Sequence, residues 1–156
     1  MEKRNKLDVF LDSNVIISGL YSSKGAPGAI MKYFIIGELM VVISQKVLEE
    51  VVFNINKKIP EILPVLRKIL LNSPPKIVKN PTSKEISKWE NVINRQDASI
   101  LAATAAANPD YLIAGDKHFF ENPDIAKKSK LDIVTPVEFL KYFKKGNVIP
   151  KHNNML

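Results

Sequence analysis

Short apolar runs alternate with longer amphipathic stretches along the chain. Most runs are rich in β-branched or aromatic residues and predict short strands, and the run at 39–43 is unbroken and predicts a buried one. The runs cover residues 7–11, 39–43, 76–78, 111–114 and 131–134. Between them, apolar residues recur at helical spacing, as at Val47, Val51 and Ile55. Strands that alternate with helices predict an α/β domain with a central, mainly parallel sheet.

Residues that typically begin or end helices lie at the boundaries of the helical segments. Ser44 is placed as the N-cap of the helix after the second run. Thr82 and Glu85 have the spacing of a capping box and predict a helix through Trp89. Two prolines, at 60 and 64, predict a helix that ends near residue 71. A loop is expected at 22–28, where glycine and proline cluster.

The length and the residue types limit the kind of protein. At 156 residues the chain has the size of one domain, which we assign to 1–145, with a polar and flexible tail at 146–156. Cysteine is absent, which excludes disulfides, thiolate zinc sites and thiol nucleophiles. Asp8, Asp12 and Asn14 interrupt the first apolar run, so we do not interpret it as a signal peptide. Gly37 and Glu38 break the run at 33–43, so no other stretch is expected to cross a membrane. We therefore expect a cytoplasmic protein.

The chain is basic, with 23 lysines and arginines against 16 acidic residues and a net charge of +7. At any single position a lysine on the surface is adequately explained by solvation. The excess as a whole attracts polyanions and speeds encounter with them. The charge makes nucleic acid a reasonable partner but identifies none.

Four carboxylates stand where an α/β sheet carries its functional site. Asp12 ends the first strand, and Asp116 follows the fourth. Asp97 opens the alanine-rich helix that leads into the fourth strand, and Glu50 lies on the helix after the second. In such sheets ligands bind beyond the carboxyl ends of the strands, at a topological switch point. We therefore expect the four acids to converge at this edge.

Convergence of like charges is costly unless a cation lies among them. Oxygen ligands without histidine or cysteine favour Mg²⁺ or Mn²⁺ over zinc. Such an ion polarises a phosphoryl oxygen, activates a water and stabilises the leaving oxygen. The constellation therefore predicts metal-dependent hydrolysis of a phosphodiester bond.

Each acid has a simpler alternative explanation. Asp12 would serve equally as a helix cap, and Asp97 as a first-turn charge favoured by the helix dipole. Asp116 would serve as a turn residue after glycine, and Glu50 as a solvated helix residue. The functional hypothesis depends on the joint placement of the four residues.

Four motifs, in order along the chain, together resemble the PIN-domain ribonucleases, and most closely the toxin components of toxin–antitoxin systems. The resemblance extends over 7–143, and its motifs are Leu11-Asp12-Ser13-Asn14-Val15, Ser44 with Glu49-Glu50-Val51, Asp97-Ala98-Ser99-Ile100-Leu101-Ala102-Ala103, and Asp110-Tyr111-Leu112-Ile113-Ala114-Gly115-Asp116-Lys117.

The resemblance implies a three-layer α/β/α fold and a catalytic Mg²⁺ or Mn²⁺ site. The metal ligands that it implies are Asp12, Asp97, Asp116 and Glu50. Ser13 and Asn14 match the polar pair that supports the first carboxylate and the substrate phosphate. It further implies RNA as the substrate, a protein antitoxin as a partner, and pairing of two copies into a homodimer.

The sequence departs from the family pattern at one position and is ambiguous at another. Ala114 stands where the family often has threonine or serine, so a hydroxyl near the fourth acid is missing. Glu49 and Glu50 both lie off the apolar face of their helix, so periodicity does not choose between them. The family pattern places an apolar residue directly after the acid, which favours Glu50, followed by Val51.

Two other functions remain open from the sequence. A haloacid-dehalogenase-like phosphatase also begins with an aspartate after its first strand, but Asn14 stands where that class has a second aspartate and cannot transfer a proton. A non-catalytic RNA-binding scaffold would keep an RNA-binding surface but would not cleave RNA.

We interpret His118 as a packing or surface residue beside Phe119 and Phe120, and Trp89 as a core or interface residue. The RNA target, the preference for RNA over DNA and the number of metal ions stay open.

Overall fold

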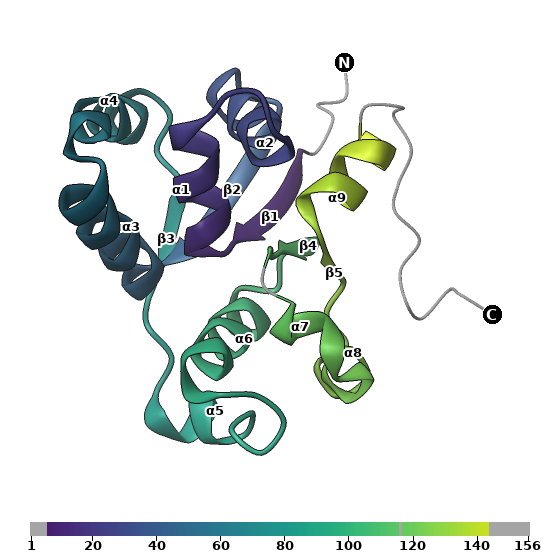
Figure 1. Ribbon diagram of the computed structural model, residues 1–156. Helices are drawn as coiled ribbons and strands as arrows, with labels where there is room; N and C mark the ends of the chain where they lie inside the picture. Colours follow the sequence, from purple (N-terminus) through teal and green to yellow (C-terminus); the bar gives the residue numbers. More distant parts are fainter. Residues whose placement is uncertain (1–5, 116, 144–156) are drawn as a thin grey trace.

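A sheet of five parallel strands, in the order β3-β2-β1-β4-β5, lies at the centre of the structure (Figure 1). The computed structural model describes residues 6–115 and 117–143. The strands of this described part are β1 (Leu7–Leu11), β2 (Leu39–Ser44), β3 (Lys76–Val78), β4 (Tyr111–Ile113) and β5 (Ile133–Val134).

Helices cover both faces of the sheet. They are α1 (Ser13–Tyr21), α2 (Ala26–Ile35), α3 (Gln45–Lys58), the single 3₁₀ turn η1 (Pro60–Ile62), α4 (Leu63–Asn72), α5 (Ser83–Ser87), α6 (Arg95–Ala107), α7 (His118–Glu121), α8 (Pro123–Ser129) and α9 (Pro136–Phe143). Figure 1 shows α1 to α4 on one side of the sheet and α5 to α8 on the other. The chain runs from β1 outward to β3 and then crosses back to β4 and β5. Right-handed crossovers in opposite directions place their helices on opposite faces. The predicted three-layer α/β/α architecture is confirmed.

All five predicted strands are present, with small changes at their ends. β4 ends at Ile113 rather than at Ala114, and β5 begins at Ile133 rather than at Leu131. The expected loop at 22–28 is shorter, because α2 begins at Ala26 and takes its proline into the first turn. Proline is well accommodated there, since the first N–H groups of a helix have no partner within the helix. The short helices α7 and α8 were not predicted.

The predicted helix caps are confirmed by their hydrogen bonds. Ser44 Oγ accepts a hydrogen bond from the backbone N–H of Val47 at 3.2 Å. Thr82 and Glu85 form both hydrogen bonds of a capping box. The helix that they begin ends at Ser87 rather than at Trp89, and turns follow Ser87. These bonds satisfy N–H groups that would otherwise lack partners at helix starts.

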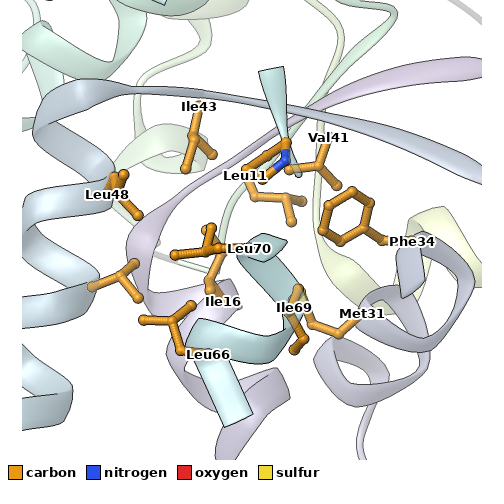
Figure 2. Close-up of a pocket in the computed structure, with 12 residues that line it drawn as sticks. Leu11, Ile16, Met31, Phe34, Val41, Ile43, Leu48, Leu66, Ile69 and Leu70 are labelled. Carbon is orange, nitrogen blue, oxygen red and sulfur yellow. The ribbon is translucent and has the colours of Figure 1, made fainter. Parts of the chain in front are cut away.

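A small apolar cavity of about 20 Å³ lies in the core beneath α4. Side chains from β1, β2 and α1 to α4 line it, and Figure 2 shows Leu11, Phe34, Val41, Leu66 and Ile69 among them. A volume of this size is close to that of a single water, and the apolar side chains around it offer no polar partner. The cavity is therefore a gap in core packing rather than a ligand site.

Among the helices that the structure describes, none combines the length and the apolar character needed to span a bilayer. The prediction of one domain over 1–145 stays a prediction, and the tail at 146–156 lies outside the described residues.

Candidate active site at the carboxyl edge of the sheet

The strand order reverses between β1 and β4, which makes their carboxyl ends the switch point of the sheet. The chain leaves β1 toward β2 on one side, and it reaches β4 on the other side only after β3. Asp12 follows β1 directly, and its backbone N–H donates to the carbonyl oxygen of Ile113, the last residue of β4, at 3.2 Å. The first predicted acid therefore lies at the switch point.

The Asp12 side chain does not cap the helix that follows it. Asp12 occupies the N-cap position of α1 and has extended backbone angles, but its carboxylate accepts no capping hydrogen bond. The residue is only 4% exposed. Burial of a carboxylate is costly unless its charge is compensated. Helix capping, the simpler alternative, therefore does not account for this buried acid.

One hydroxyl group lies between two acids. Ser13 Oγ is 3.3 Å from Oε2 of Glu50 and 3.5 Å from Oδ1 of Asp12. The contact exists because α1 packs against α3 on the same face of the sheet. A serine has a single O–H, so it donates to one of the two carboxylates at a time. Two acids this close to one donor form a place where a cation is electrostatically favoured.

The structure separates Glu50 from Glu49. Glu50 is half-buried and faces Ser13. Glu49 is exposed, and its carboxylate accepts a hydrogen bond from Gln45 Nε2, one turn earlier on α3, at 3.4 Å. Of the two candidates, Glu50 contacts the hydroxyl that also contacts Asp12, and Glu49 contacts Gln45 instead.

Asp97 is held in the first turn of α6. This helix runs back antiparallel to the strands, so its N-terminus lies at their carboxyl edge. The helix begins at Arg95, two residues before Asp97, and Asn94 is its N-cap. Asn94 Oδ1 accepts the backbone N–H of Asp97 at 3.0 Å, and Asn94 Nδ2 donates to Oδ2 of Asp97 at 2.6 Å. The acid is 8% exposed.

His118 approaches the same carboxylate. Its Nδ1 lies 3.5 Å from Oδ2 of Asp97, and its side chain is 47% exposed. Of its aromatic neighbours, Phe119 packs into the core and Phe120 is exposed. The sequence suggested packing or the surface for His118, and the contact with Asp97 was missed. The only sequence signal was its position shortly after an expected site residue.

A family model described as PIN domain matches residues 8–118 of the chain. The chain belongs to the PIN domain family. The matched range includes Asp12, Glu50, Asp97 and position 116, so it spans every predicted acid. The chain is also 28% identical, over 163 residues, to the uncharacterized protein MJ1680 of Methanocaldococcus jannaschii, with 93% of this chain and 98% of that protein covered.

Solved structures share the fold of this PIN domain. A toxin–antitoxin complex from Klebsiella pneumoniae superposes with a TM-score of 0.55 at 21% identity, covering 82% of this chain and 97% of that one. VapC20 of Mycobacterium tuberculosis, a sarcin–ricin loop cleaving toxin, superposes with a TM-score of 0.52 at 17% identity, covering 72% of this chain and 92% of that one. At these identities the likeness establishes the fold.

The remaining predicted site residues of the PIN domain are placed less fully. Asp116 lies outside the described residues. Before it, Ala114 is fully buried and its N–H donates to the carbonyl of Val134 at 3.0 Å, so position 114 continues the pairing with β5. Asn14 is exposed on the first turn of α1. Convergence of four acids stays a prediction.

The donor chemistry of the site fits a hard divalent ion. Within 6–115 and 117–143, no three acidic or histidine side chains are close enough together to form a metal site. In the described part, Asp12 and Glu50 are linked through the Ser13 hydroxyl, and Asp97 contacts His118 directly. Mg²⁺ is commonly bound by one or two carboxylates, with waters and substrate phosphates completing its octahedron. Two carboxylates around one serine hydroxyl therefore suit Mg²⁺ or Mn²⁺.

Proposed function

We propose that this PIN domain is a metal-dependent endoribonuclease and the toxin of a toxin–antitoxin pair. The main support is the placement of Asp12 and Glu50 around the Ser13 hydroxyl at the switch point of the sheet. Acids gathered at this edge suit phosphodiester chemistry better than packing or capping, because the carboxylate of Asp12 is buried and makes no cap.

In this proposal the carboxylates hold Mg²⁺ or Mn²⁺, and the polar residues beside them orient the reacting groups. Asp12 and Glu50 are ligands, joined by Asp97 and Asp116. A bound ion supplies Lewis-acid polarisation of the phosphoryl oxygen and a water of lowered pKa. Ser13 keeps the first two carboxylates in place through its hydroxyl. Asn14, exposed at the start of α1, is placed to contact the substrate phosphate.

RNA as the substrate draws support from the charge of the chain and from the fold. A net charge of +7 favours association with a polyanion. Not every basic residue is available for this purpose. Lys128 Nζ donates to the carbonyl of Lys88 at 2.7 Å and lies 5.3 Å from the centre of the Trp89 ring, so it holds α8 against the segment after α5. Lys117, 80% exposed beside His118, is better placed for a phosphate backbone, since its contact is an exposed ion pair with Glu121 at 3.9 Å.

A protein antitoxin and a second copy of the chain are the proposed partners, and the cytoplasm is the proposed location. The Klebsiella pneumoniae structure with this fold is a toxin–antitoxin complex. Large apolar side chains are exposed on three helices of this chain, at Tyr21, Phe53 and Leu71. Partner proteins would remove such surface from water.

The test is cleavage of a mixed pool of single-stranded RNA with Mg²⁺ or Mn²⁺. We expect cleavage by the wild type that stops when a chelator is added. Asp12→Asn and Asp97→Asn should abolish it while their circular dichroism and thermal unfolding stay like those of the wild type, because the amide removes charge at nearly constant shape. Equal cleavage by these variants would rule out the proposed site. Binding of RNA without cleavage would favour the scaffold function instead.

A further inference from the structure

The carboxylate of Asp97 is held by one of its two oxygens. Asn94 Nδ2 donates to Oδ2 at 2.6 Å, and His118 Nδ1 lies 3.5 Å from the same oxygen. Oδ1 accepts no hydrogen bond from the residues that the structure describes. The side chain of Asp97 is 11% exposed, so water has little access to it. The two oxygens of this acid therefore have different environments.

We propose that Asn94 and His118 are positioning residues that hold Asp97 by Oδ2 and leave Oδ1 to bind the metal ion. The inference rests on the proposed function and assigns a role to two residues outside the four acids. A ligating carboxylate is generally kept in one orientation by hydrogen bonds to its other oxygen, and these outer contacts tune the affinity for the metal. We call Asn94 and His118 together the Asp97 clamp.

The two halves of the clamp come from different parts of the fold. Asn94 is the N-cap of α6, and it bonds both the backbone N–H and the carboxylate of Asp97. It thus fixes the side chain relative to the axis of its own helix. His118 begins α7, beyond the end of β4, and approaches from outside that helix. The clamp therefore fixes Asp97 relative to both α6 and the segment that follows β4.

Helix capping by itself does not account for these contacts. A cap needs only the Asn94 Oδ1 acceptor, whereas the bond from Nδ2 to the carboxylate is additional. The contact of His118 with Asp97 involves a half-exposed side chain, and pairs of this kind contribute little to stability. Replacing His118 should therefore lower the affinity for the metal ion far more than the stability of the fold.

The experiment measures Mn²⁺ affinity of the full chain by electron paramagnetic resonance of the free ion, without RNA. The variants are His118→Ala, His118→Asn, His118→Gln and Asn94→Ser. Serine caps a helix as well as asparagine does but lacks the amide donor. An asparagine amide nitrogen occupies about the position of Nδ1, whereas a glutamine amide extends further, toward the position of Nε2.

We expect Mn²⁺ affinity to fall about 10- to 100-fold in His118→Ala and in Asn94→Ser. His118→Asn should restore most of the affinity, and His118→Gln should not. Circular dichroism and thermal unfolding provide the control for folding. RNA cleavage by both weakened variants should recover at saturating Mn²⁺, whereas cleavage by Asp97→Asn should not.

The clamp would be overturned if His118→Ala and Asn94→Ser bound Mn²⁺ as tightly as the wild type does. It would also be overturned if the wild type bound no Mn²⁺. Failure of the proposed function has a different result. In that case Mn²⁺ binds and weakens in the clamp variants as expected, but no variant and no wild type cleaves RNA. The two failures are therefore distinguishable.

Discussion

The hydroxyl oxygen of Ser13 lies 3.3 Å from Oε2 of Glu50, and these residues are 37 positions apart in the chain. The contact joins the first turn of α1 to the middle of α3, next to the carboxylate of Asp12. It places one hydroxyl within reach of two predicted acids, Asp12 and Glu50. The first two predictions test this contact.

Replacing Ser13 with alanine should weaken Mn²⁺ binding by about 10- to 100-fold. The hydroxyl contacts both Asp12 and Glu50, and without it the two carboxylates lose a shared donor. The measurement is a Mn²⁺ titration with a parallel RNA cleavage assay. Ser18→Ala, which changes an exposed serine of the same helix, is the matched control and should behave like the wild type. Unaltered binding by Ser13→Ala would contradict the role given to this hydroxyl.

Glu50→Gln should lower Mn²⁺ affinity and RNA cleavage at least about tenfold, whereas Glu49→Gln should leave both unchanged. The two side chains point in different directions, since Glu50 faces Ser13 and Glu49 faces Gln45 along the outer surface of α3. The two variants have the same chemistry at adjacent positions, so each is the control for the other. A larger loss in Glu49→Gln would show that the second acid is misassigned.

Gly19→Ala should destabilise the protein by about 1–3 kcal/mol through overpacking between α1 and α2. A β-carbon at Gly19 would lie 2.5 Å from Met31 Cγ and 2.7 Å from the carbonyl oxygen of Pro27, and a backbone carbonyl cannot move aside cheaply. Gly25→Ala is the matched control, since its nearest neighbour would be Pro27 Cδ at 3.6 Å, an ordinary contact. Urea unfolding of both variants gives the free energies. Equal stabilities would show that the two helices can separate without cost.

The capping box of α5 should make a pH-dependent contribution to stability. The backbone N–H of Thr82 and then its hydroxyl hold the pKa of Glu85 below its ordinary value of 4.5. A carboxyl with a lowered folded-state pKa stabilises the folded protein above its unfolded pKa, and this contribution is lost as pH falls through the folded pKa.

Wild type and Glu85→Gln can therefore be compared by thermal unfolding from neutral pH downward. The wild type should unfold at the higher temperature near neutral pH, and the difference should vanish well below pH 4.5. A difference that grows on acidification would contradict the capping box. The effect should be small, because Glu85 is partly exposed and solvent screens its charge.

The strands and their parallel arrangement could be predicted because both faces of the sheet are covered. A strand covered on both faces is apolar at most positions, so runs such as 39–43 differ clearly from the amphipathic helices around them. Asp12 was predictable for the same reason, since it is the first charged residue after the central strand and the switch point follows from the order of elements. The cap of α6 was also accessible, because Asn94 stands three residues before Asp97, but that signal was missed.

The choice between Glu49 and Glu50 could not be made from helical periodicity. Adjacent residues on a helix differ by about 100° in direction, and both of these lie off the apolar face. Which one turns toward the site depends on where α1 packs against α3. The family pattern favoured Glu50, and the structure places Glu50 beside Ser13.

By itself, the sequence determined the order and type of the main elements, the three-layer parallel architecture and the position of the first acid at the strand edge. These follow from local rules of hydrophobic pattern, helix capping and strand burial, and from the family motifs. Only the tertiary structure decided which side chains meet, namely Ser13 with Glu50 and His118 with Asp97. The physical reason is that such contacts depend on the packing of separate helices against one sheet, and the distances between those helices are set by the whole core rather than by any local segment.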